Sequence, residues 1–195
     1  MLSMAFLLLL INCNQFFISV AFVTTSGVAA IINKLKELED RGIKGKVLVS
    51  QYLNFTQPEA LKRLVQFKNI DLRIATTGNA HTKGYIFKSK EHYNLIVGSS
   101  NLTADALSTN QEWNLKVKAH KDSDIIKSFF REFQLAYDKA IQVTEEYLVE
   151  YSKIYANRIF SEKKLKETDE EDIERLFSPN KMQSEALIAI KKLRN

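Results

Sequence analysis

Along the first part of the chain, the pattern of apolar and polar residues predicts helices and strands in alternation. The uncharged opening stretch predicts a buried helix up to about Asn12 and then a buried strand over residues 16–23. An apolar stripe at helical spacing predicts a helix that Ser26 caps and that ends near Leu38. The chain therefore begins as an alternation of helices and strands, which is typical of α/β domains.

Strands dominate the next part of the sequence. Thr56 is expected to cap one further helix, with Pro58 in its first turn. Apolar runs predict strands over residues 46–50, 70–75, 83–88, 93–97 and 112–117. A strand–helix alternation followed by several neighbouring strands predicts an α/β fold with a mixed β-sheet flanked by helices.

The last third of the chain is predicted to be helical. Asp122 or Ser123 can cap a helix whose apolar face packs on the sheet, and a second helical stretch is expected over residues 147–160. Residues 163–174 form a mixed charge run typical of a solvated linker or helix face, and a last helix restarts after Ser178. The fold is thus expected to end in a C-terminal helical extension.

Composition and charge indicate the cellular compartment and the kind of partner to expect. Cys13 is the only cysteine, so the chain forms no intrachain disulfide and no structural zinc site, which suits a reducing cytosol. The apolar opening run lacks a preceding Lys or Arg and breaks at residues 12–15, short of the roughly 20 apolar residues that span a bilayer. We therefore expect a soluble, cytoplasmic protein with no membrane partner. Residues 1–120 carry a net charge of +6 and residues 121–195 a net charge of −1, so a polyanion would bind to the first part.

Three short segments carry groups suited to phosphoryl transfer. Positions two apart on a strand share a face, so His81 and Lys83 are expected to project into one site. The next strand ends at Gly98, where a glycine allows close backbone approach, and delivers Asn101 beside them. Histidine is a nucleophile near neutral pH, lysine and amide groups neutralise developing charge, and the Glu112 carboxylate can orient an imidazole.

Two neighbours of these segments are given supporting or structural roles. Ser99 is expected to fix the His81 loop by hydrogen bonding, since no Gly-x-Ser-x-Gly surrounds it. Trp113 should face the other side of the sheet from Glu112 and pack in the core. No HExxH motif or carboxylate cluster is present, so no metal site is expected.

The order His81-Thr82-Lys83, Gly98-Ser99-Ser100-Asn101 and Glu112 resembles the HKD signature of the phospholipase D superfamily, in its bacterial nuclease and restriction-endonuclease branch. Lys88 stands where the superfamily has an Asp five residues after the Lys, a departure that weakens a lipase more than a nuclease reading. The resemblance covers roughly residues 16–140 and is similar to the nuclease domain fused ahead of bacterial superfamily II helicases.

The resemblance implies a metal-independent DNA phosphodiesterase without a cofactor. A single HKD copy implies a homodimer in which two copies of His81 form one active site, one as nucleophile and the other as acid. Lys83 and Asn101 would hold the phosphate oxygens, and Glu112 would orient a histidine.

The C-terminal segment around Gln183 resembles the adenine-recognising segment that precedes a helicase P-loop. The expected domains are a phospholipase D-like nuclease domain over 1–142, a helical linker over 143–176 and a truncated helicase start over 177–195, with ATP serving only the missing helicase. Two other functions stay open: a catalytically weak module that binds DNA or dimerises its helicase, and a phospholipase.

Overall fold

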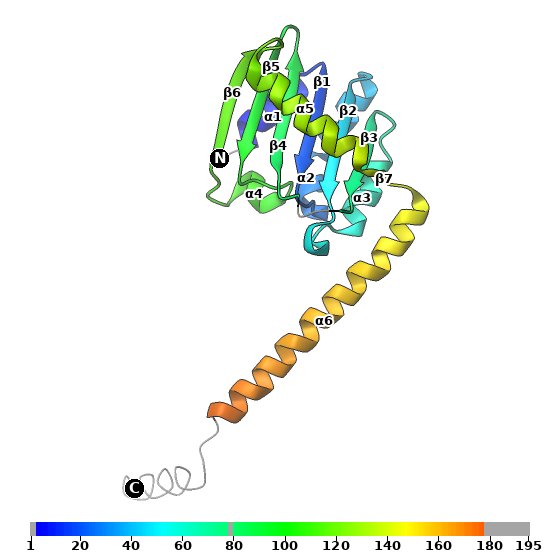
Figure 1. Cartoon of the computed structure of the whole chain (residues 1–195), viewed down its shortest axis with the longest axis vertical. Helices are drawn as coiled ribbons and strands as arrows, with labels where there is room; N and C mark the ends of the chain where they lie inside the picture. Colours follow the sequence, from blue (N-terminus) through cyan, green and yellow to red (C-terminus); the bar gives the residue numbers. More distant parts are fainter. Residues whose placement is uncertain (1–2, 78–79, 178–195) are drawn as a thin grey trace, which may run out of the picture. The chain divides into compact units, whose positions relative to one another are not determined.

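The computed structural model describes residues 3–77 and 80–177, and a seven-stranded sheet lies at its centre (Figure 1). The strands are β1 (Gln15–Val20), β2 (Lys44–Ser50), β3 (Ile70–Ala75), β4 (Lys83–Ser89), β5 (His92–Gly98), β6 (Asn114–His120) and β7 (Ile141–Gln142). The helices are α1 (Ser3–Ile11), α2 (Thr25–Asp40), the 3₁₀ turn η1 (Tyr52–Asn54), α3 (Pro58–Val65), α4 (Ala104–Ser108), α5 (Asp124–Lys139) and α6 (Glu145–Phe177).

The sheet is mixed, which confirms the predicted fold class. Its strand order is β6-β5-β4-β1-β2-β3-β7, with β1, β2 and β3 parallel and the remaining pairs antiparallel. The parallel strands are linked through α2 and α3, whereas β4 and β5 form a hairpin. Because β4 runs against β1, the start of β4 lies beside the carboxyl end of β1.

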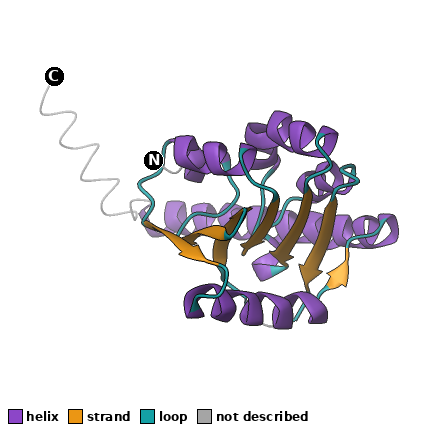
Figure 2. Cartoon of the chain, turned by 90° about the horizontal axis from the view of Figure 1, so that it is seen from above, coloured by secondary structure: helices purple, strands orange, loops and turns teal. Residues whose placement is uncertain are grey.

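Helices cover both faces of the sheet (Figure 2). On one face, Phe16, Ile18 and Val20 of β1 belong to the core that α1, α2 and α3 close. On the other face, Phe17 packs edge-on against Phe130 and Phe133 of α5. Two covered faces explain why β1 is apolar at almost every position instead of alternating.

Helix and strand boundaries lie within about three residues of the predictions, except that α6 continues to Phe177, and two helix caps differ. Thr24, not Ser26, accepts a hydrogen bond from the Gly27 N–H at the start of α2. Thr56 is fully buried and donates its hydroxyl to the Ser50 carbonyl, and Gln57 precedes α3 instead. Both hydroxyl residues stand within two positions of the true cap, so composition alone does not separate them.

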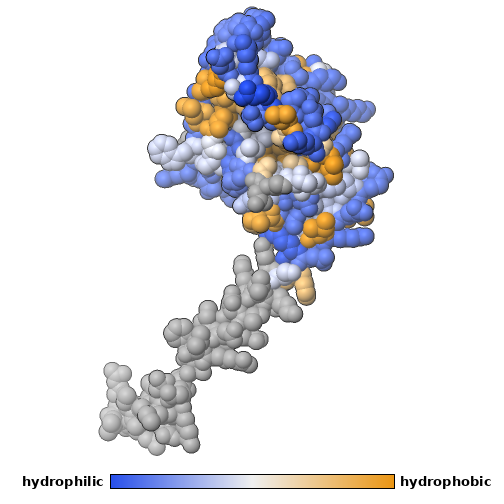
Figure 3. All heavy atoms as spheres, viewed as in Figure 1, coloured by the Kyte–Doolittle hydropathy of each residue, from blue (hydrophilic) through white to orange (hydrophobic). Residues whose placement is uncertain are grey.

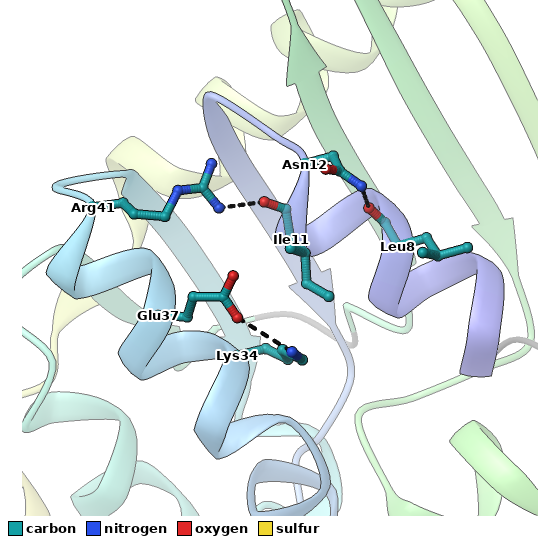
Figure 4. Close-up of polar contacts among 6 residues, drawn as sticks. All are labelled: Leu8, Ile11, Asn12, Lys34, Glu37 and Arg41. Atoms are coloured by element: carbon teal, nitrogen blue, oxygen red, sulfur yellow. Dashed lines mark hydrogen bonds and ion pairs between the residues drawn. The ribbon is translucent and has the colours of Figure 1, made fainter.

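The opening apolar stretch is part of the folded domain. Phe6 and Leu10 of α1 are fully buried, and Phe6 packs edge-on against Tyr85, so the predicted buried helix is confirmed. At the end of α1 the Arg41 guanidinium donates to the Ile11 carbonyl, and Asn12 donates to the Leu8 carbonyl (Figure 4). The Arg41 bond gives the Ile11 carbonyl a partner that the helix end does not supply, whereas the Asn12 side chain adds a second bond to the Leu8 carbonyl, which also accepts from the Asn12 backbone N–H. Among the described residues, no helix has both the length and the apolar character that crossing a membrane requires.

The chain divides into two units, Met1–Tyr155 and Ala156–Asn195. Within the first unit, Leu148 and Tyr151 at the start of α6 are buried in the main core, and the Tyr151 hydroxyl donates to the Thr56 carbonyl. Residues 163–174, predicted as a linker or helix face, are helical within α6. The helix expected after Ser178, with Gln183, lies outside the described residues.

Candidate active site

The segments that carry the predicted site residues come together at one end of the strands, where β1 and β5 end and β4 and β6 begin. Val20 pairs with Lys83 across β1 and β4, Gly84 pairs with Val97 across the hairpin, and Gly98 pairs with Asn114. The strand register therefore brings the segments 81–83, 98–101 and 112–114 together, although they lie far apart in the sequence.

His81 lies exposed just ahead of β4. Its ring centroid is 4.7 Å from that of Tyr52, at an interplanar angle of 54°. The Lys83 ammonium donates to the His81 carbonyl at 3.1 Å, and the Thr82 hydroxyl lies 2.9 Å from that of Ser19. Tyr52 belongs to η1, which the sequence patterns did not predict, so this aromatic neighbour of the histidine is new.

Lys83 is half-buried, and the charge of Glu112 affects its pKa. Desolvation lowers the pKa of the Lys83 ammonium, and the Glu112 carboxylate opposes that shift. Burial raises the pKa of Tyr85 well above its usual range, and Glu112 raises it further. Both effects place the Glu112 charge within electrostatic range of the strand that carries Lys83.

Asn101 is fixed against the end of β1. Its side chain is 8% exposed, and its Oδ1 accepts hydrogen bonds from the backbone N–H groups of Ala21 (3.1 Å) and Phe22 (3.3 Å). The preceding Ser100 carbonyl accepts a hydrogen bond from the buried Tyr85 hydroxyl at 3.0 Å. The oxygen of Asn101 is thereby engaged, which leaves its Nδ2 amide as the group free to meet a phosphate oxygen.

Ser99 connects the end of β5 to Glu112 and Trp113. Its hydroxyl donates to the Glu112 carboxylate and accepts from the Trp113 N–H at 3.1 Å, while its own N–H donates to the Trp113 carbonyl at 3.0 Å. The prediction that Ser99 fixes the His81 loop is therefore wrong. It holds the opposite side of the site, because the backbone after Gly98 runs beside residues 112–114.

Gly98 permits this close approach, as the sequence predicts. A Cβ atom at this position would lie 2.0 Å from the Trp113 carbonyl oxygen and 2.7 Å from the Asn114 Cα. No side chain fits at such distances, so a glycine is required for β5 and β6 to meet here.

Trp113 does not pack in the core, which corrects the prediction. Its side chain is 90% exposed. Strand β6 begins at Asn114, two residues later than predicted, and it is an edge strand. Trp113 therefore lies outside the ladder, and no element of the described part of the chain covers it.

A pocket of 390 Å³ adjoins Lys83 on the α5 side of the sheet. Its walls are mainly apolar, with Val97 of β5 facing Phe129 and Phe133 of α5. Only Lys83 and Glu132 contribute charged groups to it. Lys83 therefore joins this apolar pocket to the strand ends at which the candidate site lies.

The strand register brings together segments that carry an imidazole, an ammonium, an amide and a carboxylate, and each chain supplies one histidine, His81, to this group. Glu112 is engaged with Ser99 and has no hydrogen bond to His81 in the described part of the chain. Within the same residues, no group of three or more His, Cys, Asp or Glu side chains could hold a metal ion.

The sequence matches a family described as "Cardiolipin synthase, PLD-like domain" over residues 10–135. No curated protein matches the chain. NucT from Helicobacter pylori has a similar structure, with a TM-score of 0.56 at 18% identity over 71% of this chain and 89% of that one.

Two further solved structures share the fold. Nuc from Salmonella typhimurium, a phospholipase D family member, has a TM-score of 0.53 at 18% identity and covers 71% of this chain and 88% of its own. Phosphatidylserine synthase from Haemophilus influenzae Rd KW20 has a TM-score of 0.55 at 14% identity, over 82% of this chain and 43% of its own. At such identities the likeness concerns the fold.

Proposed function

The chain belongs to the phospholipase D superfamily as a PLD-like domain, and on this premise we propose that it is a metal-independent phosphodiesterase that cleaves DNA through a phosphohistidine on His81. The proposal rests on the assembly of His81, Lys83 and Asn101 at one end of the sheet. There β1 and β5 end and β4 and β6 begin. The similar folds of NucT and Nuc support a nuclease, and the fold of phosphatidylserine synthase, at a similar TM-score, keeps a lipid enzyme as the second candidate.

In the first step His81 attacks phosphorus in line, forming a P–N bond while the P–O bond to the leaving strand breaks. A histidine from a second copy gives its proton to that leaving oxygen and then accepts one from the water that hydrolyses the phosphohistidine. Lys83 and the Asn101 Nδ2 donate to the non-bridging oxygens, where negative charge gathers in the transition state. Glu112 would orient the partner histidine, since its own His81 is not bonded to it.

A homodimer is the first consequence of this mechanism. Each chain supplies one histidine, and its His81 side chain is exposed, so two copies must meet to supply nucleophile and acid. Analytical ultracentrifugation at micromolar concentration should report twice 22.4 kDa. A strictly monomeric protein that still cleaves DNA would reject the shared site.

Metal independence is the second consequence. The nucleophile, the acid and the positive charge are all side chains, so DNA cleavage should persist in excess EDTA. Raising the salt concentration should weaken it instead, because lysine–phosphate contacts release counterions. Cleavage that stops in EDTA and returns with magnesium would point to two-metal chemistry.

The proposal is tested by incubating the purified chain with plasmid and short oligonucleotides, and in parallel with phosphatidylcholine vesicles. Hydrolysis of DNA alone supports the nuclease. Hydrolysis of lipid alone would favour the phospholipase, for which the apolar pocket beside Lys83 is the supporting observation. DNA binding without turnover would favour the module that serves a restriction-type helicase.

A further inference from the structure

Trp113 is the chain's only tryptophan, and its 90% exposed side chain stands directly after Glu112. Its backbone is held by hydrogen bonds to Ser99 through both its N–H and its carbonyl. The indole is thus free in solvent while its Cα is fixed at the site. A large aromatic side chain that is rigidly based but uncovered is typical of a binding surface.

Strand β6, which follows Trp113, carries exposed apolar and basic side chains on its two faces. Leu115 pairs with Val97 across β5 and β6, and these two residues are 66% and 45% exposed. The next residue, Lys116, is exposed and has no carboxylate within 4.0 Å in the part of the chain that the structure describes. Figure 3 shows separate apolar patches on a face of the molecule that is otherwise mainly hydrophilic.

We infer that Trp113 stacks on an unpaired nucleobase of the strand whose phosphate lies at His81 and Lys83, so that the site takes single-stranded nucleic acid in preference to duplex. This inference rests on the proposed nuclease function. An aromatic side chain stacks on a base of any sequence, and a cation beside it attracts the backbone, which is the usual combination in single-strand binding. A paired base in a duplex is already stacked on both faces and offers the indole only its edge.

The charge of the first part of the chain favours nucleic acid as the occupant. Residues 1–120 carry the whole basic excess of the sequence, and a phosphate backbone is complementary to it. In the shared-site dimer a second copy contributes its histidine, and the indole faces the nucleic acid bound at that site.

The single tryptophan makes the inference directly measurable. The full-length His81→Ala variant, which cannot turn over, is titrated with a 12-nucleotide single strand, with the blunt duplex of the same sequence, and with an abasic strand of equal charge. The ordinary strand should quench Trp113 emission and bind about 5- to 100-fold more tightly than the abasic strand. The duplex should bind without quenching.

Substitutions in the His81→Ala background separate base stacking from non-specific binding. Trp113→Ala should lower the affinity for the ordinary strand to that for the abasic strand, and Trp113→Phe should restore most of it. Leu135→Ala, which removes a 55% exposed side chain from α5, is the matched control and should change neither value.

Four outcomes would overturn the inference. Equal quenching by ordinary and abasic strands would remove the base from the contact. Blue-shifted emission of the free protein that shifts to the red on dilution would show that a second copy covers the indole. If wild-type protein cleaves the single strand while Trp113→Ala binds it normally, the stacking role of Trp113 is rejected and the proposed nuclease function is retained. If wild-type protein neither binds nor cleaves DNA, both fail.

Discussion

His81→Ala is expected to lower the rate of DNA cleavage by on the order of 10³-fold or more while leaving folding and dimerisation intact. The imidazole is the covalent nucleophile of the proposed mechanism, so its loss removes the whole two-step pathway. The ring is exposed and touches Tyr52, so its removal leaves no buried cavity. Single-turnover cleavage of a labelled oligonucleotide measures the effect, and circular dichroism checks the fold.

The chain offers a matched histidine control. His92 is also exposed, but it begins β5 and lies at the opposite end of that strand from Gly98, where its ring meets His120. His92→Ala should cleave at the wild-type rate. Lys83→Ala and Asn101→Ala should both lose most activity, because each removes charge stabilisation in the transition state. Near-wild-type cleavage by His81→Ala would reject the assignment of the nucleophile.

The sheet was predictable because its strands carry simple signals. Residues 70–75 were predicted and found as β3, and the polar turn between the hairpin strands marked β4 and β5 correctly. Burial on both faces makes β1 almost continuously apolar, whereas β3 alternates apolar and charged residues, and both patterns can be read without knowledge of the fold. The short elements η1, α4 and β7 were missed, since two to five residues hold too little periodicity to detect.

The segments of the candidate site could be picked out from the sequence, and the strand register brings them together, but their contacts could not be predicted. The spacing of His81 and Lys83 on one strand predicts a shared site, whereas the partner of Ser99 depends on how β6 lies against β5. Trp113 shows the limit most clearly. Alternation along a strand places it on the sheet, yet the ladder starts one residue later, and an edge strand leaves it in solvent. Strand ends and edges are set by tertiary pairing, which a single sequence does not display.

Gly98→Ala is expected to reduce both stability and activity. The new Cβ would lie 2.0 Å from the Trp113 carbonyl oxygen and 2.7 Å from the Asn114 Cα, so backbone must move. Overpacking of this kind costs about 1–3 kcal/mol. For a chain of this size that should lower Tm by roughly 2–12 °C, measured by thermal unfolding under circular dichroism. Because the displaced segment carries Glu112, cleavage below Tm should fall on the order of 10²-fold, the expected cost of an ångström of misplacement.

Gly84→Ala is the matched control for this substitution, because it adds the same methyl group one strand away. Its Cβ would lie 3.1 Å from the Phe129 ring edge, a side-chain contact that a slight ring movement relieves. We expect a Tm change well below that of Gly98→Ala and no comparable loss of cleavage. A Cβ at position 98 would meet backbone atoms of Trp113 and Asn114, whereas a Cβ at position 84 would meet the end of the Phe129 side chain. Equal losses in the two variants would mean that added volume alone is responsible, and the close approach of β5 to residues 113–114 would then have no special part in forming the site.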